Sequence, residues 1–260
     1  MSEIAFMTAN YVARETGWAM RGWGHGDHAT NEHFRPLETF AERFDDLLAG
    51  IRELGFETID LWGAHLHPSW ATDEHVAAAR ESLARRGLVV ATYAAWIDAA
   101  SVERACVIAT AVGSRVIGAG ASGDLAALVP VLREHDVCLA IENHPERTPS
   151  EVLAKIAAGR GTLAATVDTG WWATHGYDAT RAIEELGVNV RHVHLKDVLA
   201  EGEPHDTCRW GDGIVDIVGC VRALQRIGYE GAIAIEHEPE DHDPSEECRE
   251  MLRELRRWLQ

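Results

Sequence analysis

Four segments in the second half of the chain each end an apolar run with a side chain that could bind a metal ion. Their sequences are AIENHP, ATVDTGWW, RHVHLKD and AIAIEHEP, and the ligand-type residues are Glu142, Asp168, His194 and Glu236. Three carboxylates that converge on one point repel one another unless a cation neutralises them. One imidazole with three carboxylates suits a divalent ion, so we expect one bound Mn2+, with Mg2+, Co2+ or Zn2+ as alternatives.

The elements that must position these residues follow from an alternation of apolar runs and amphipathic segments. Runs typical of strands occupy residues 4–9, 58–62, 88–94, 115–119, 137–141, 163–167, 190–195 and 232–235. Apolar residues at helical spacing occupy residues 40–54, 73–86, 101–112, 124–135, 149–158, 178–186, 215–227 and 245–259. This pattern predicts an α/β fold, a single-domain (β/α)8 TIM barrel over residues 1–260. The competing doubly wound sheet usually has a Gly-x-Gly-x-x-Gly turn after its first strand, which is missing here.

In a barrel the carboxyl ends of the strands open on one mouth, so the four ligand-type residues should meet there. Taken singly, each acid could equally cap a helix or pair with an arginine. Their common register on four successive strands favours a shared site.

Glycine and small polar residues mark the predicted helix boundaries. We expect left-handed helix stops at Gly55, Gly87, Gly113, Gly187 and Gly228. We expect helix N-caps at Asp73, Ser101 and Ser150. The one irregular connection, Asn10–Pro36, contains RGWGHGDHATNEH and is expected to form either a lid or a surface for subunit packing.

Composition narrows the class of partner. The formal net charge of −18 disfavours nucleic acid and anionic membranes, and 46% hydrophobic residues suffice for a core. The five cysteines form no Cys-x-x-Cys pair, which indicates reduced thiols, and Cys208 is expected to be inert. We see no export signal or membrane span, and therefore expect a cytoplasmic protein that forms a homo-oligomer and acts on a small molecule.

The motifs IENH, VDTG, HVHLKD and IEHEP, in this order on an eight-unit pattern, resemble the xylose isomerase-like TIM-barrel superfamily of sugar isomerases and epimerases. The resemblance covers nearly the whole chain. It implies that Glu142, Asp168, His194 and Glu236 are metal ligands. It also implies that Glu142 and Glu236 form an acid/base pair on opposite faces of the substrate, and that His144 and Arg209 hold substrate oxygens.

One position departs from that pattern. Many relatives have histidine three residues after the strand-6 aspartate, where this chain has Trp171. The change argues against direct transfer of the epimerase substrate-binding scheme. It also argues against the DNA-repair endonuclease branch, whose metal cluster needs further histidines.

Other polar residues near the strand ends admit more than one interpretation. Lys196 lies two residues after His194 on the same strand face, and could stabilise an enediolate oxygen or only orient a ligand through an ion pair with Asp168 or Asp197. His144 could be a general base, a hydroxyl partner or a hydrogen-bonding residue behind the site. His65 and His67 could contact substrate or a second metal, or pack within their loop.

Aromatic residues follow several of the predicted strands, and flat rings suit the C–H faces of a sugar. We expect at least two of them, with Trp62 and Trp171 foremost, to line the mouth; the others are Trp96, Trp172 and Trp210. The segment His205–Gly213 lacks the Gly-rich cationic character of a phosphate cradle, which favours an unphosphorylated substrate.

These features predict a metal-dependent sugar isomerase or epimerase. One of Glu142 and Glu236 would remove a proton beside a carbonyl to give a metal-bound enediolate, which is reprotonated elsewhere or from the other face. Lys196 and His144 would assist, with Trp62, His65, Trp171 and Arg209 binding substrate. The alternative is a lyase or dehydratase that eliminates from a keto-inositol or a 3-oxo-glycoside. A sugar- or metal-sensing module is the non-enzymatic reading, but we find no second domain to receive a signal.

Overall fold

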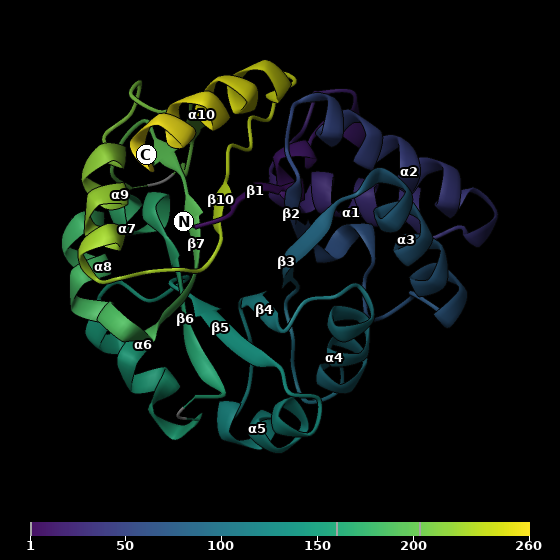
Figure 1. Cartoon of the computed structure of the whole chain (residues 1–260), viewed down its shortest axis with the longest axis horizontal. Coiled ribbons are helices and arrows are strands. Elements are labelled where there is room, and N and C mark those ends of the chain that lie inside the picture. The colour runs from purple at the N-terminus through teal and green to yellow at the C-terminus, as the bar shows by residue number, and fades with distance from the viewer. Residues whose placement is uncertain (1, 160, 203) are drawn as a thin grey trace.

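The computed structural model describes residues 2–159, 161–202 and 204–260. Within these ranges eight parallel strands close into a barrel in the order β1-β10-β7-β6-β5-β4-β3-β2 (Figure 1). The strands are β1 (Ile4–Met7), β2 (Thr58–Trp62), β3 (Val89–Ala94), β4 (Val116–Ala119), β5 (Cys138–Glu142), β6 (Leu163–Asp168), β7 (Val190–Leu195) and β10 (Ile233–Ile235). The predicted barrel is confirmed.

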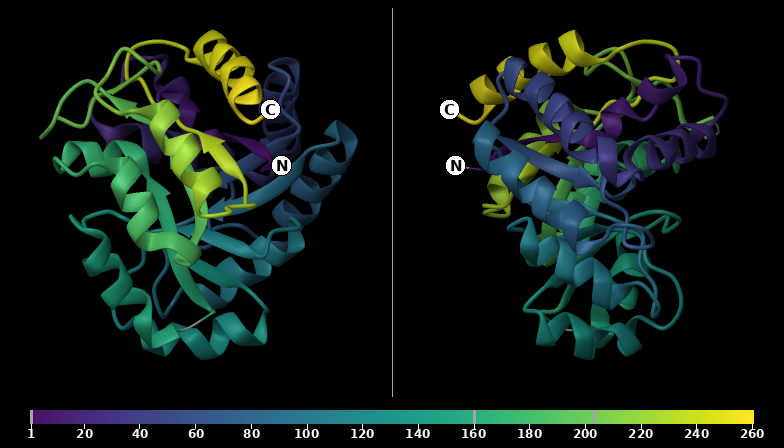
Figure 2. Two further views of the ribbon diagram at one scale, coloured as in Figure 1. Left: turned by 60° about the vertical axis from the view of Figure 1, so that its left-hand side comes forward. Right: turned by 90° about the vertical axis from the view of Figure 1, so that its right-hand side faces the viewer.

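Helices surround the strands, and the two chain ends lie side by side at one end of the barrel (Figure 2). The helices at the predicted positions are α2 (Leu37–Glu53), α3 (Asp73–Arg86), α4 (Val102–Ala111), α5 (Leu125–Glu134), α6 (Pro149–Ile156), α8 (Ala179–Leu186), α9 (Ile217–Arg226) and α10 (Ser245–Trp258). In α2 the apolar stripe is buried, as its spacing predicts: Phe40, Phe44, Leu47, Leu48 and Ile51.

The predicted glycine stops all have a positive φ, between 52° and 97°. The prediction of a left-handed helical stop is wrong for Gly187, whose ψ is −127°. Two of the predicted N-caps are wrong. Thr72 caps α3, because its hydroxyl accepts from the His75 amide, and Asp73 is the first helical residue. Thr148 precedes Pro149 at the start of α6, which leaves Ser150 inside the helix.

The prediction of an irregular connection over Asn10–Pro36 is wrong, because it contains helix α1 (Trp23–Phe34). This helix lacks a continuous apolar stripe, and its buried positions are Gly26, Thr30 and Phe34. A Cβ at Gly26 would lie 2.3 Å from the Met20 sulfur and 2.5 Å from the Val12 carbonyl oxygen. Close packing onto a glycine therefore fixes α1, which is why hydrophobic spacing does not reveal it.

Three further short elements lie between the ligand-bearing strands. Helix α7 (Thr169–Thr174) begins directly after β6, and β8 (Asp197–Val198) pairs antiparallel with β9 (Thr207–Cys208) after β7. Asp197 accepts hydrogen bonds from the amides of Gly211, Gly213 and Val215, which folds the β7–α9 connection back over the barrel end.

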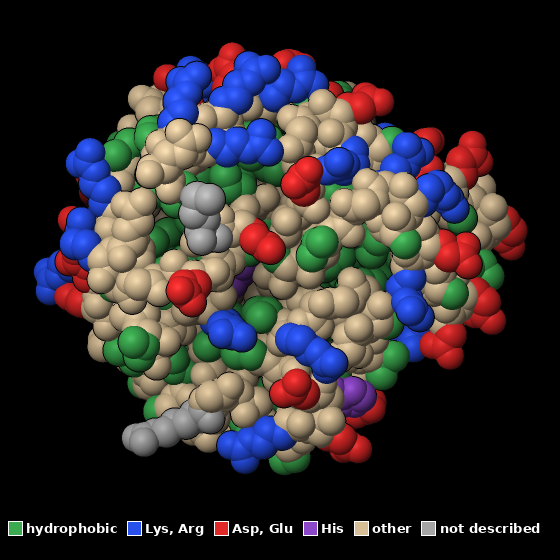
Figure 3. Space-filling view, in the orientation of Figure 1, with side chains coloured by type: hydrophobic (Ala, Val, Ile, Leu, Met, Phe, Trp, Pro, Cys, Tyr) green, Lys and Arg blue, Asp and Glu red, His purple; other side chains and the backbone are tan. Residues whose placement is uncertain are grey.

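Acidic and basic side chains intermingle on the molecular surface, and Arg side chains lie among acids along α10 (Figure 3). Among the described helices none is both long and apolar enough to span a bilayer.

Candidate active site

The strand register brings the four predicted ligand residues together at the carboxyl ends of the strands. Asp168 at the end of β6 pairs with His194 on β7, and His194 is level with Ala234 on β10, two residues before Glu236. One ligand-type atom from each of Glu142, Asp168, His194 and Glu236 lies within 4.8 Å of the others. The His194 Nδ1 atom is 2.8 Å from Glu142 Oε1 and 3.1 Å from Glu236 Oε2.

The residues in this cluster fit a divalent cation. Asp168, His194 and Glu236 are buried. Asp168 Oδ2 and Glu236 Oε2 contact Lys196 and His194 as ion pairs, but neither oxygen accepts a geometrically defined hydrogen bond among the described residues. The three carboxylates outnumber the Lys196 ammonium, so with His194 neutral the cluster has an excess of negative charge that a divalent ion would offset. Burial raises the pKa of Asp168 to about 6, with Lys196 opposing the rise and Glu236 and Glu142 adding to it. A carboxyl group whose pKa is raised by burial and by neighbouring carboxylates is typical of a site that holds a cation.

Asp60, on β2, determines how His194 is oriented. Its Oδ2 atom lies 2.9 Å from His194 Nε2 and also contacts His192 Nε2. Because a carboxylate only accepts, the Nε2–H of His194 points at Asp60 and Nδ1 points at Glu142 and Glu236. The Glu236 and Glu142 carboxylates overcome burial and hold the pKa of His194 well above its usual value, so Nδ1 takes either a proton or a metal ion.

Lys196 lies directly beyond the end of β7 and is buried with its ammonium among carboxylates. Its Nζ atom is 3.1 Å from Asp168 Oδ2, 3.2 Å from Glu236 Oε1 and 3.0 Å from Glu238 Oε2. These acids outweigh burial and hold the pKa of Lys196 well above its usual range, so it remains charged. Glu238, which sequence reasoning did not select, has its pKa raised by burial although Lys196 opposes the rise.

A cavity of about 1010 Å³ opens over this cluster. Its walls include the predicted Trp62, Trp171 and His144, and also His67 and Trp96. Trp23 from α1 lies 5.5 Å from Trp62, ring centre to ring centre, and completes an aromatic wall. The sequence analysis did not select Trp23, because it did not predict helix α1.

Two predicted substrate contacts lie elsewhere. His65 is not among the described lining residues; it is buried beneath Trp62, with its Nδ1 atom 3.2 Å from the Thr8 hydroxyl. Arg209 forms an ion pair with Glu250 on the outer helix α10, 3.0 Å away, and is likewise outside the described lining. Trp172 and Trp210 are buried in the core.

His205 is a cavity residue that sequence reasoning missed. Trp171 is stacked between the rings of His144 and His205, with centroid distances of 4.1 and 3.9 Å. The Nδ1 atom of His205 is 2.6 Å from the Thr174 hydroxyl, while its Nε2 atom is buried without a hydrogen-bond partner in the described structure. Burial lowers the pKa of His205 to about 3, so the ring is neutral near pH 7. His205 lies ten residues after the end of the barrel strand β7, so the search for polar residues at strand ends did not select it.

The lining is strongly acidic. Asp27, Asp206, Glu240 and Asp241 join the acids already described, whereas Lys196 is the one Lys or Arg among the described lining residues. An ammonium already shared by three carboxylates offers little to a substrate phosphate. This environment agrees with the expectation of an unphosphorylated substrate.

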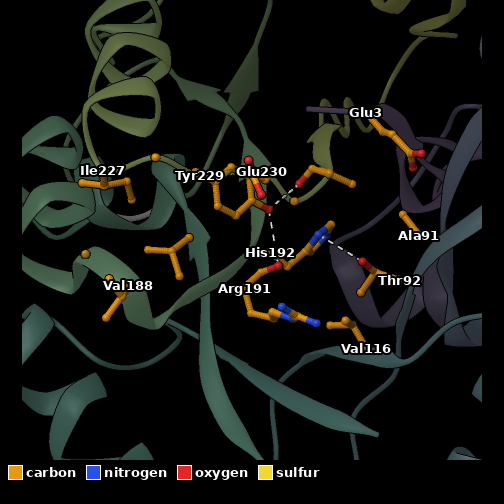
Figure 4. Close-up of a pocket in the computed structure, with 15 residues that line it drawn as sticks. Glu3, Ala91, Thr92, Val116, Val188, Arg191, His192, Ile227, Tyr229 and Glu230 are labelled. Carbon is orange, nitrogen blue, oxygen red and sulfur yellow. Dashed lines mark hydrogen bonds between the residues drawn. The ribbon is translucent and has the colours of Figure 1, made fainter. Parts of the chain in front are cut away.

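A second cavity of about 610 Å³ opens at the opposite end of the barrel, where the strands begin (Figure 4). Glu3, Arg191 and Tyr229 lie around it, and His192 and Thr92 form its floor with a 3.0 Å hydrogen bond. The other ring nitrogen of His192, Nε2, contacts the Asp60 carboxylate, which also holds His194. This cavity therefore reaches a residue that contacts the support of His194.

Comparison with known proteins agrees with this arrangement. Residues 48–259 match the family described as "Xylose isomerase-like TIM barrel". A curated relative, an uncharacterized protein of Methanocaldococcus jannaschii, is 25% identical over 122 residues, which cover 44% of this chain and 41% of that protein. The matched region therefore spans less than half the length of that relative.

Three solved structures share the fold. The probable 3-DHS dehydratase AsbF of Bacillus anthracis superposes with a TM-score of 0.72 at 13% identity, covering 98% of each chain. A xylose isomerase-like protein of Mycobacterium smegmatis in complex with magnesium gives 0.71 at 16% identity, covering 100% of this chain and 97% of the other. A D-psicose 3-epimerase gives 0.64 at 20% identity, covering 85% and 93%. At these identities the likeness concerns the fold alone, and the family match over most of the chain establishes that this protein belongs to the xylose isomerase-like TIM barrel family.

Proposed function

We propose that this protein is a metal-dependent isomerase or epimerase of a neutral keto-sugar or keto-polyol. The observation that carries the proposal is that the Glu142 and Glu236 carboxylates both contact His194 Nδ1, at 2.8 and 3.1 Å, among the residues that line an aromatic cavity. A divalent ion bound by Glu142, Asp168, His194 and Glu236 would draw electron density from a substrate carbonyl and acidify the adjacent C–H bond.

Glu142 and Glu236 carry out the proton transfers in this proposal. One carboxylate takes the carbon-bound proton, the C–H electron pair forms the C=C bond of an enediolate, and the former carbonyl oxygen gains the negative charge. The other carboxylate returns a proton from the opposite side. Lys196 remains charged among Asp168, Glu236 and Glu238, where it limits the repulsion between those carboxylates.

The acidic cavity supports a neutral substrate. A phosphate or carboxylate on the substrate would face the acids of the lining without an arginine or a second lysine among its described residues. The four lining tryptophans, Trp23, Trp62, Trp96 and Trp171, would pack against C–H faces of a sugar ring.

A second candidate is β-elimination, which begins with the same proton removal. Elimination also needs an acid that protonates the leaving oxygen. The glutamate that took the carbon-bound proton can deliver it there. His205 supports this alternative, because it lines the cavity and its buried Nε2 atom has no hydrogen-bond partner among the described residues. If the Thr174 hydroxyl donates to Nδ1, then the Nε2–H of the neutral ring can donate a hydrogen bond to the leaving oxygen.

Proton exchange tests both candidates at once. Neutral ketohexoses such as D-fructose and D-tagatose, incubated with the protein in D2O at saturating Mn2+, should exchange the proton beside the carbonyl, as followed by NMR. Glu142→Gln and Glu236→Gln should each slow the exchange by about 10²–10⁴-fold, as loss of a general base does. Glu240→Gln removes a charge from the same cavity and is the matched control.

Two outcomes would change the assignment. Wild-type exchange rates in both Gln variants would show that the base lies elsewhere. Loss of water from a keto-inositol together with exchange would replace isomerisation by elimination.

A further inference from the structure

A group of metal-ligating side chains lies outside the cluster described above. His237 follows β10, His242 lies in the β10–α10 connection and Glu247 is in the first turn of α10. The Nε2 atoms of His237 and His242 lie 3.0 and 3.1 Å from the same oxygen, Glu247 Oε2. All three ligand-type atoms fall within 4.8 Å of one another.

Both ring nitrogens of His242 face carboxylate oxygens, so a proton or a metal ion must lie at Nε2 as well as at Nδ1. Its Nδ1 atom is 2.7 Å from Asp241 Oδ1, and a carboxylate only accepts, so Nδ1 carries the proton. A neutral His242 then presents a lone pair at Nε2 to another acceptor, Glu247 Oε2. This contact is repulsive unless a second proton or a metal ion lies between the two atoms.

The ring nitrogens of His242 and His237 that would not bind the metal ion also have hydrogen-bond partners of the kind found around metal sites. A ligating histidine commonly donates its other ring N–H to a carboxylate, as His242 does to Asp241. His237 is buried, and its Nδ1 atom is 3.2 Å from the Thr207 hydroxyl on β9, which orients the ring. Zinc binds imidazole nitrogen and carboxylate oxygen at about 2.0–2.1 Å, which sets two such ligand atoms about 3.4 Å apart at the tetrahedral angle. The observed 3.0 and 3.1 Å need only a small adjustment.

We propose that His237, His242 and Glu247 form a second metal site, distinct from the barrel centre, that binds a zinc-type transition-metal ion. Two imidazoles and one carboxylate favour Zn2+ over Mg2+ or Mn2+, whereas the carboxylate-rich barrel cluster suits the harder ions. His242 and Glu247 are partly exposed, with 48% and 32% of their side-chain surface accessible, so an ion can enter from solvent and keep water as a further ligand.

A metal ion at this site would restrict the movement of the β10–α10 connection, which forms part of the cavity wall. Residues 238–242 line the cavity, and the Glu240 carbonyl accepts from the amide of Met20, which packs beside α1. An ion bound by His237, His242 and Glu247 would tie this connection to both β10 and α10. Thr207 extends the tie to β9.

Metal counting on the full-length chain tests the proposal. Protein stripped with chelator and then saturated with Mg2+ is titrated with Zn2+ by calorimetry. Wild type should bind one more equivalent of Zn2+ than His242→Ala and than Glu247→Ala. His135→Ala is the matched control, because it removes a surface histidine that pairs with Glu103 without a second imidazole. It should keep the wild-type stoichiometry.

Cobalt supplies a second readout. Co2+ in a four-coordinate site with nitrogen ligands absorbs strongly in the visible range, and this absorption should be lost in His242→Ala. Equal Zn2+ stoichiometry in wild type and His242→Ala, with equal Co2+ spectra, would overturn the proposal. A Glu142→Gln, His194→Ala double variant shows whether this Zn2+ binds independently of the barrel centre. It should still bind the Zn2+ that His242→Ala loses. If wild type binds only that ion, the barrel metal centre fails and the second site stands.

Discussion

At the scale of single residues, Asp60 holds Nε2 of His194 and so determines that Nδ1 faces the Glu142 and Glu236 carboxylates. The contact spans more than half of the chain, from β2 to β7, and it is buried. In metal proteins a carboxylate that holds the far side of a ligating histidine keeps both the tautomer and the ring orientation.

We therefore expect Asp60→Asn to weaken metal binding at the barrel centre by about 10–100-fold, as loss of such a partner typically does. Calorimetric titration with Mn2+, which the second site disfavours, measures the change. Thr92→Val is the control, because it removes a hydrogen bond to His192 one step further from His194. A larger loss of affinity in Thr92→Val than in Asp60→Asn would contradict the assignment.

His205 separates the two candidate reactions. If its Nε2–H group stabilises the leaving oxygen by a hydrogen bond, His205→Gln should reduce elimination by about 10²–10³-fold while the initial deuterium exchange continues. If the protein only isomerises or epimerises, the same variant should mainly raise KM. Parallel NMR measurements of exchange and of product formation distinguish these outcomes. The variant His175→Gln controls for loss of a ring beside the tryptophan, because the His175 ring also lies near Trp171, with ring centroids 5.8 Å apart.

At the scale of elements, helix α1 completes the cavity and depends on one glycine. The Cβ of an alanine at position 26 would lie 2.3 Å from the Met20 sulfur, whereas Gly24 in the same helix has no neighbour within 4 Å of such an atom. The two positions form a matched pair.

Gly26→Ala should lower the free energy of unfolding by about 1–3 kcal/mol through overpacking. Gly24→Ala should leave it unchanged or raise it by up to about 1 kcal/mol, because alanine favours the helix. Urea denaturation followed by circular dichroism measures both changes. Equal stability of the two variants would show that α1 does not pack as described.

His65 lies in the turn after β2 and supports Trp62 from below. Burial, with a smaller contribution from Arg14, lowers the pKa of its imidazole to about 3 in the folded chain, against about 6.5 when unfolded. The folded state therefore favours neutral His65. Its contribution to stability is complete above about pH 6.5 and is lost as the pH falls towards 3.

Between pH 7.5 and pH 5 this residue should account for about 2 kcal/mol of the loss in unfolding free energy. His65→Gln removes the titrating group, so its stability should depend less on pH over that interval. Denaturant titrations of wild type and variant at several pH values test this, and parallel pH profiles would refute it.

At the scale of the whole molecule, excess negative charge and an acidic cavity act in the same direction. The chain carries a formal charge of −18, and Lys196 is the one Lys or Arg among the described residues that line the cavity. Both features repel an anionic substrate, and the repulsion is long-range at low salt.

A neutral ketose should therefore be processed with a higher kcat/KM than its phosphate ester, by at least about tenfold, which corresponds to about 1.4 kcal/mol. The ratio should shrink as salt is added, because salt screens the repulsion. Steady-state assays of the matched pair of substrates at low and high ionic strength measure it. A preference for the phosphate ester would contradict the neutral-substrate proposal.

The sequence was sufficient to predict the eight-unit barrel and the four residues that meet at the carboxyl ends of its strands. Strand and helix periodicities are local, and parallel strands bring their carboxyl ends together whatever the details of packing. Glu142, Asp168, His194 and Glu236 could therefore be selected from strand-end positions, and Trp62 and Trp171 from the positions that follow them.

Only the tertiary structure decided which other side chains reach the site. Asp60 lies within an apolar strand, His205 lies in a connection that returns over the barrel end, and α1 packs through Gly26 without an apolar stripe. Arg209 and His65 have suitable types and positions, yet one pairs with α10 and the other is buried under Trp62. Each of these outcomes depends on contacts between segments distant in sequence, and local spacing carries no information about such contacts.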